Sequence, residues 1–170
     1  MDIAKTASDW ARFELHSAAV FIAFGLAFAL AGLGFRQLGT TDMARAYVVP
    51  MLVAGGLLLI LGMGLFFPAQ ARLATVPTAL RGDPAGFVAA EIARTDKVLN
   101  DYRIAVFRVF PAIIALCAMA IPFLDGPLWR ASLITAIAMF TVLILVDSNA
   151  NGRLGAYRAQ LSLAEGFRHP

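Results

Sequence analysis

Six charged or polar residues lie where apolar helices are expected to meet water; five of them can carry a proton or form an ion pair, and the sixth is an asparagine. They are Glu14, His16, Arg103, Arg108, Asp147 and Asn151. Asp147 is the most conspicuous, because a carboxylate at the end of a hydrophobic segment is a functional-site hypothesis by default. Its alternative role is an ion pair with Arg103 or Arg108, each expected within about one helical turn of its level. The sequence favours the ion pair.

Glu14 and His16 come just before the first long apolar stretch. An acid and an imidazole at a membrane entrance can relay protons or line the mouth of a pore. They are also explained as interfacial residues beside Lys5 and Arg12, and this simpler interpretation is favoured. Asn151 follows Asp147 and is expected to form hydrogen bonds near the membrane boundary.

Residues that would support catalysis or metal binding are few. The chain has one cysteine, Cys117, and two histidines, His16 and His169. A single cysteine excludes an intramolecular disulfide and a CxxC redox pair. No acidic cluster has the spacing of metal ligands. We therefore expect no metal, no cofactor and no enzymatic activity.

The composition is that of a membrane protein. Of the 170 residues, 60% are hydrophobic and 15% are charged, and the mean hydropathy is +0.76. Soluble domains carry about 25% charged residues and about half apolar ones. The net charge of +3 is not gathered into a basic polar face, so we expect no nucleic-acid partner. The sequence predicts an all-α, polytopic membrane protein whose first partner is the lipid bilayer.

Four apolar stretches are long enough to cross a hydrocarbon core of about 30 Å. The predicted spans are residues 16–36, 46–68, 105–124 and 128–147. The other predicted segments are an interfacial helix at 1–15, a linker at 69–83, and helical extensions at 84–104 and 148–165. A chain of this length has room for one domain, so we expect a single membrane domain over residues 1–170.

Small residues recur along the first two spans. In the first span, Gly25, Ala29 and Gly32 follow one another at steps of four and three. Such a strip lets another helix approach closely, as is usual in lipid. The second span contains Gly55, Gly56, Gly62 and Gly64. We interpret these glycines as helix contacts; the alternative is a flexible gating hinge.

An apolar stripe continues from the third span into its charged extension. Its members alternate at steps of four and three and are Val88, Ile92, Thr95, Leu99, Tyr102, Val106 and Val109. This spacing keeps one side of a helix toward a partner. The extension of the fourth span has a matching side formed by Leu154, Tyr157 and Leu161. A tight turn at residues 125–127 joins the two spans, so the extensions are predicted to pair as an antiparallel hairpin, either within one chain or between copies.

The basic residues are distributed unevenly between the two sides of the predicted membrane. Four spans place both termini on one side, which collects 11 of the Lys and Arg residues against 3 on the other. Cytoplasmic loops carry the excess of basic residues. We therefore expect a multi-pass protein of the cell (inner) membrane, with both termini, the linker and the helical hairpin in the cytoplasm.

The sequence favours two functions over a third, a membrane enzyme, for which no nucleophile or metal constellation is visible. The first is a homo-oligomeric channel or pore-type transport protein, because one small four-helix bundle has no room for an aqueous path and needs several copies. Its copies would assemble through the cytoplasmic hairpin. The second is a non-catalytic accessory or scaffold subunit of a larger membrane complex, which would dock through the same hairpin.

Overall fold

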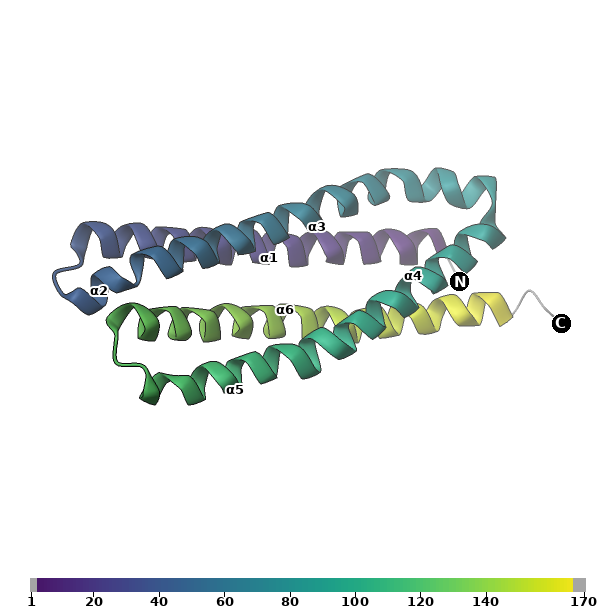
Figure 1. Cartoon of the computed structure of the whole chain (residues 1–170). Coiled ribbons are helices and arrows are strands. Elements are labelled where there is room, and N and C mark those ends of the chain that lie inside the picture. The colour runs from purple at the N-terminus through teal and green to yellow at the C-terminus, as the bar shows by residue number, and fades with distance from the viewer. Residues whose placement is uncertain (1–2, 167–170) are drawn as a thin grey trace.

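The protein folds as four long helical rods, seen in a computed structural model that describes residues 3–166 (Figure 1). The first three elements are α1 (Ile3–Leu38), α2 (Asp42–Ala46) and α3 (Val48–Gly82). The third rod comprises α4 (Pro84–Ile104), the π-helical turn η1 (Ala105–Val109), α5 (Phe110–Ala120) and the 3₁₀ turn η2 (Ile121–Phe123). The fourth rod is α6 (Pro127–Gly166). Each rod contains an apolar window that is long enough to cross a membrane, which confirms the predicted all-helical fold with four potential spans.

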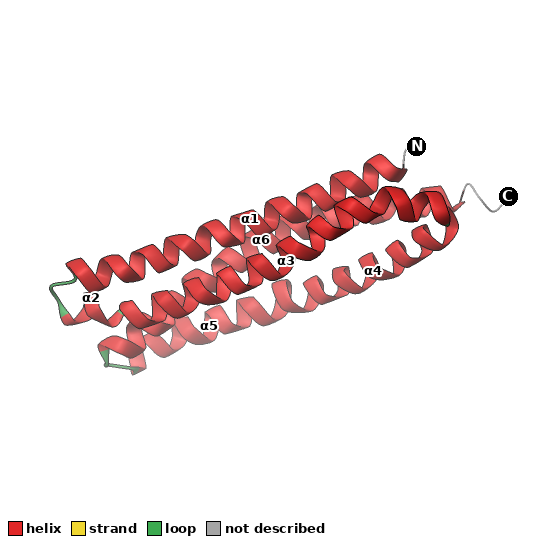
Figure 2. Cartoon of the chain, turned by 90° about the horizontal axis from the view of Figure 1, so that it is seen from above, coloured by secondary structure: helices red, strands yellow, loops and turns green. Residues whose placement is uncertain are grey.

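The rods run up and down along one axis. The start of α1, the α3–α4 turn and the end of α6 lie together at one end of the bundle, which we call the terminal end (Figure 1). The two short loops lie at the opposite end (Figure 2). Asp83 makes the turn at the terminal end, because its extended backbone (φ −142°, ψ 90°) stops α3 and its Oδ1 accepts a hydrogen bond from the Gly86 N–H at 2.9 Å.

The helices are longer than the predicted segments. Residues 3–38 form one continuous helix instead of an interfacial helix followed by a span. The residues expected as a linker continue α3 to Gly82, although Pro68 and Pro77 lie inside it. A proline removes a helical hydrogen bond. Ala69 and Val76 are both buried against the bundle, and this tertiary packing maintains the helix.

The third rod changes its winding where proline enters it. A proline ring at position 111 cannot pack against the carbonyl of residue 107 in a regular α-helix. The turn before it is widened, so that the Phe110 N–H donates to the carbonyl of Ala105, five residues back. Such π turns accommodate a local interruption without ending the helix. The rod therefore continues from the charged extension into the apolar span, as the sequence predicted.

The first and second rods pack at their glycines. A Cβ atom at Gly25 would lie 2.9 Å from the backbone N of Leu59, and one at Gly55 would lie 2.8 Å from the backbone N of Ala29. Gly62 makes a similar approach to α1. These contacts confirm the predicted packing strip. Gly56, by contrast, faces open space, so only part of the glycine series serves helix contact.

Two apolar clusters hold the four rods together. The central cluster contains Phe21, Phe28, Ala54, Leu58, Val142, Leu143 and Val146. The cluster at the terminal end joins Ala7, Trp10, Val76, Leu154, Tyr157 and Leu161, with Ile92, Leu99 and Tyr102 packed against it. The apolar sides of α4 and α6 are thus covered within one chain. Large apolar side chains elsewhere, such as Leu30 and Phe123, are exposed on the outer surface, where lipid would surround a membrane protein.

Candidate functional site

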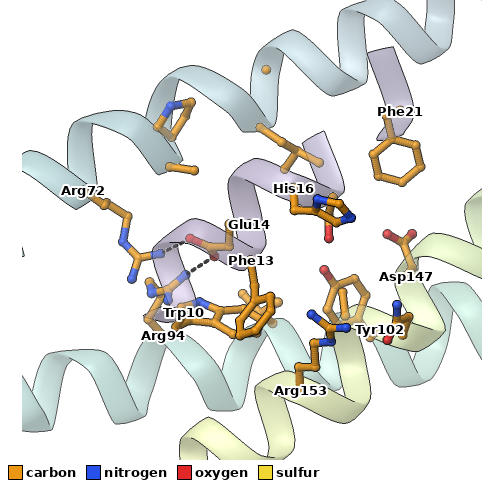
Figure 3. A pocket seen from close by; sticks show the side chains of 18 residues that line it. Trp10, Phe13, Glu14, His16, Phe21, Arg72, Arg94, Tyr102, Asp147 and Arg153 are labelled. Atoms are coloured by element: carbon orange, nitrogen blue, oxygen red, sulfur yellow. Dashed lines mark hydrogen bonds and ion pairs between the residues drawn. The ribbon is translucent and has the colours of Figure 1, made fainter. Parts of the chain in front are cut away.

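Four charged side chains from three rods form a closed ring near the terminal end. Glu14 comes from α1, Arg72 from α3, and Glu91 and Arg94 from α4. Arg72 donates to Glu14 at 2.7 Å and also to Glu91. Arg94 donates to Glu14 at 3.2 Å and to Glu91 at 2.8 Å. Each guanidinium therefore bridges both carboxylates (Figure 3 shows the two bonds to Glu14).

The fourth rod joins this ring through Tyr157. Its hydroxyl donates a hydrogen bond to Glu91 Oε1 at 3.1 Å. The Tyr157 ring stacks on Trp10 of α1, with 5.7 Å between the ring centroids and 7° between their planes. Glu91 is only 7% exposed, so its charge must be balanced inside the protein. All four rods are thereby joined at one polar point.

The environment of Glu91 keeps its carboxylate ionised. Glu91 lies in the charged extension, outside the apolar part of the third rod. Burial alone raises the pKa of this carboxyl group, but the hydrogen bonds and charge of Arg94, the charge of Arg72 and the Tyr157 hydroxyl together bring it below its ordinary value. A carboxylate held in this way is suited to fixing helices and unsuited to accepting a proton near neutral pH.

A cavity of about 360 Å³ lies between the ring and the central apolar cluster. All four rods line it, and its charged residues are Glu14, Arg72, Arg94, Asp147 and Arg153. Phe13, His16 and Arg153 are exposed members of its lining, so the cavity reaches the surface between α1 and α6. The Arg153 guanidinium lies over the Phe13 ring, 4.3 Å from its centroid. This volume falls within the range of small-molecule sites.

Asp147 lines this cavity but does not form the ion pair that the sequence favoured. Among the described residues, no ion pair or hydrogen bond joins Asp147 to Arg103 or Arg108. Both arginines are exposed. The rotation of about 100° per residue in a helix explains this exposure. Tyr102 faces the cavity, so Arg103, the next residue, points away from it. Val106 is buried, so Arg108, two residues later, faces outward.

The remaining residues predicted as functional, Glu14, His16 and Asn151, lie in three different environments. Glu14 belongs to the charged ring, and His16 lies at the cavity with its side chain exposed. Asn151 is half-buried and does not line the cavity, whereas Asn149 does. The expectation that Glu14 serves beside Lys5 and Arg12 as an interfacial residue is therefore replaced by its pairing with two distant arginines.

Sequence reasoning missed most of the charged ring. Glu91 lies three residues after Val88 and four before Thr95, and all three are buried. That spacing places Glu91 on the inner side of the helix, so an acid within the apolar stripe was the available signal. Arg72 offered no comparable signal, because it lies in the segment interpreted as a linker.

No metal centre accompanies these residues in the part of the chain from 3 to 166. No group of three or more His, Cys, Asp and Glu side chains comes close enough there to hold a metal ion. Comparison with known proteins adds no further constraint: no family model, no curated protein and no solved structure is similar to this chain.

Proposed function

We propose that this protein is a channel- or pore-type transport protein that works as a homo-oligomer in the cell (inner) membrane. The observation that supports this function is the cavity, which reaches the surface and exposes Asp147 to it at the start of the apolar region. A carboxylate that is accessible from one side and lies at the end of a span is suited to receiving a cation or a proton. In this proposal the terminal end is cytoplasmic and the cavity is the cytoplasmic vestibule.

The need for several copies follows from what lies beyond the cavity. Phe21, Leu58 and Val146 of the central cluster close the middle of the bundle. Residues 3–166 of a single chain therefore offer no polar path to the far side, and in this proposal a transported species passes between copies. The surface that we assign to this contact is α5, which has no buried residue of its own.

A contact through α5 differs from the assembly through the helical hairpin that the sequence predicted. The seven residues expected to mediate assembly are Val88, Ile92, Leu99, Tyr102, Leu154, Tyr157 and Leu161. In the structure they are buried or half-buried, and six of them belong to or pack against the cluster at the terminal end. Assembly through them would require the bundle to open, so contact through α5 is the simpler route.

The first test is the mass and activity of the purified protein. Light scattering in detergent should show a single oligomer of fixed subunit number, and reconstituted liposomes should show ion flux. The Asp147→Asn variant should fold normally and alter the rate or selectivity of flux. A monomer without flux over a range of voltage and pH would contradict the proposal.

A second candidate is a non-catalytic accessory or scaffold subunit of a larger membrane complex. The observation that favours it is that one chain covers its own apolar clusters and charged ring. Such a chain is complete as a monomer and can dock through its lipid-facing surface. Co-purification of one other membrane protein in fixed stoichiometry, together with absence of flux, would support this second function.

A further inference from the structure

The charges of the cavity are separated into two groups. Figure 3 shows Arg72, Arg94 and Glu14 together on one side, whereas Asp147 lies on the other side beside Tyr102. The two arginines are matched by Glu14 and by the neighbouring Glu91. No ion pair or hydrogen bond to another described residue occupies Asp147. The far side of the cavity therefore presents the negative charge of Asp147, while Arg153 of the same helix lies over the Phe13 ring and is not paired with this carboxylate.

The surroundings of that charge are aromatic and apolar. Phe21 and Tyr102 line the cavity near Asp147, and Leu65 and Val98 are also part of its lining. Aromatic faces attract cations, and the ring of Phe13 already holds the guanidinium of Arg153 in this cavity. A carboxylate beside aromatic rings is the arrangement that recognises an ammonium group with an organic body.

Other ligand classes fit the lining less well. A bare metal ion requires several oxygen ligands, and Asp147 is the only carboxylate on its side of the cavity (Figure 3). An anion would be repelled by Asp147, and Arg72 and Arg94 are already bound to carboxylates. Arg153 is the remaining cation of the lining, and it lies over an aromatic ring.

We propose that this cavity binds a small organic cation, a protonated or quaternary amine, with Asp147 as its counter-ion and the rings of Phe21 and Tyr102 against its alkyl groups. The ammonium group can belong to a free amine or to an amphiphile that enters from the membrane. Binding at this site does not depend on the proposed transport function, because an accessory subunit can bind the same ligand.

The test is calorimetric titration of the full-length protein, in an uncharged detergent, with tetramethylammonium chloride and with dodecyltrimethylammonium chloride. Both probes should bind at one site. Asp147→Asn should weaken binding of either probe at least tenfold, whereas Asp125→Asn, in the exposed turn at the far end of the bundle, should leave it unchanged. Tighter binding of the dodecyl probe would support a membrane amphiphile as the source, and equal binding a free amine; either result supports the site.

Tyr102→Leu keeps the proposal testable if Asp147→Asn does not fold. Loss of the ring should weaken tetramethylammonium binding by about three- to tenfold, the range expected for one cation–π contact. The proposal would be overturned if the wild type binds neither probe, or if both variants bind the probes as tightly as the wild type. It would also be overturned if the protein binds sulfate instead and Arg153→Gln abolishes that binding. Binding without flux would contradict the transport function alone, and flux without probe binding would contradict the cation site alone.

Discussion

The contact between α1 and α3 depends on the absence of a side chain at Gly55. The substitution Gly55→Ala, which adds one methyl group, tests this dependence. A Cβ at this position would lie 2.8 Å from both the backbone N of Ala29 and the backbone O of Gly25. Ordinary contact begins near 3.4 Å, so the rods would have to separate by about 0.6 Å at this point. Both of these atoms belong to the backbone, so neither can move away by rotation of a side chain. Gly55→Ala must therefore shift a helix backbone.

Gly56→Ala is the matched control, because this neighbour lies at almost the same depth of the same helix but faces open space. Both variants gain the same helix propensity, about 1 kcal/mol. Gly55→Ala additionally carries the cost of overpacking, about 1–3 kcal/mol. We expect Gly56→Ala to be unchanged or more stable than the wild type, and Gly55→Ala to be less stable than Gly56→Ala by about 1–3 kcal/mol.

The measurement is reversible unfolding in mixed dodecyl maltoside and SDS micelles, followed by far-UV circular dichroism. Comparing the two variants cancels the propensity gain and leaves the packing cost. If they unfold at the same SDS fraction, the rods are not in close contact at Gly55, and the role of the glycine strip in packing is refuted.

Three further predictions concern the charged ring and the orientation of the chain. Glu91→Gln should lower the free energy of unfolding by about 1–3 kcal/mol, because it leaves two partly buried arginines with one carboxylate. The same unfolding assay should show little change for the control variant Asp96→Asn, because the ion pair of Asp96 with Arg158 is exposed. The pKa of Glu91 is lowered from its ordinary value of 4.5, so its stabilisation is complete above that pH and is lost as the pH falls through the lower folded-state value. Unfolding measured from pH 7 to pH 3 should therefore show a loss of stability below about pH 4.5 that is smaller in Glu91→Gln, and an identical pH profile in the two proteins would contradict this role. In a Cys117→Ser background, Gly82→Cys should react with an impermeant maleimide only from the cytoplasmic side and Thr40→Cys only from the opposite side; the reverse pattern would overturn the orientation inferred from basic residues.

The long-range features that follow from periodicity could be predicted from the sequence. Four apolar stretches predicted the four long apolar helices, and the small residues around Gly25 predicted a close contact between rods. The apolar side containing Leu154 and Tyr157 indicated that α6 would pack against α4. In each case one chemical property recurs along one helix, so the signal does not depend on knowing which other helix lies opposite.

Pairing between specific charged residues could not be predicted in the same way. Arg72 meets Glu14 across 58 positions of sequence, and neither residue indicates its partner. The predicted ion pair of Asp147 failed for a related reason. Equal distance from a turn sets the level of two residues but not the direction of their side chains, and exposed Arg108 is separated from buried Val106 by two positions. Rotation about the helix axis depends on packing with all neighbours at once.

The charged ring and the cavity explain together why one carboxylate is left without a cation. The bundle buries Glu91 and brings Glu14 beside it, and two arginines neutralise both at the terminal end. This leaves none of the ring's positive charge for Asp147 on the other side of the cavity. Because the ring and the Tyr157 hydroxyl together tie all four rods to one another, the helices cannot easily rotate to bring an exposed arginine inward. The same contacts that stabilise the bundle thus keep Asp147 available to a cation that comes from outside the chain.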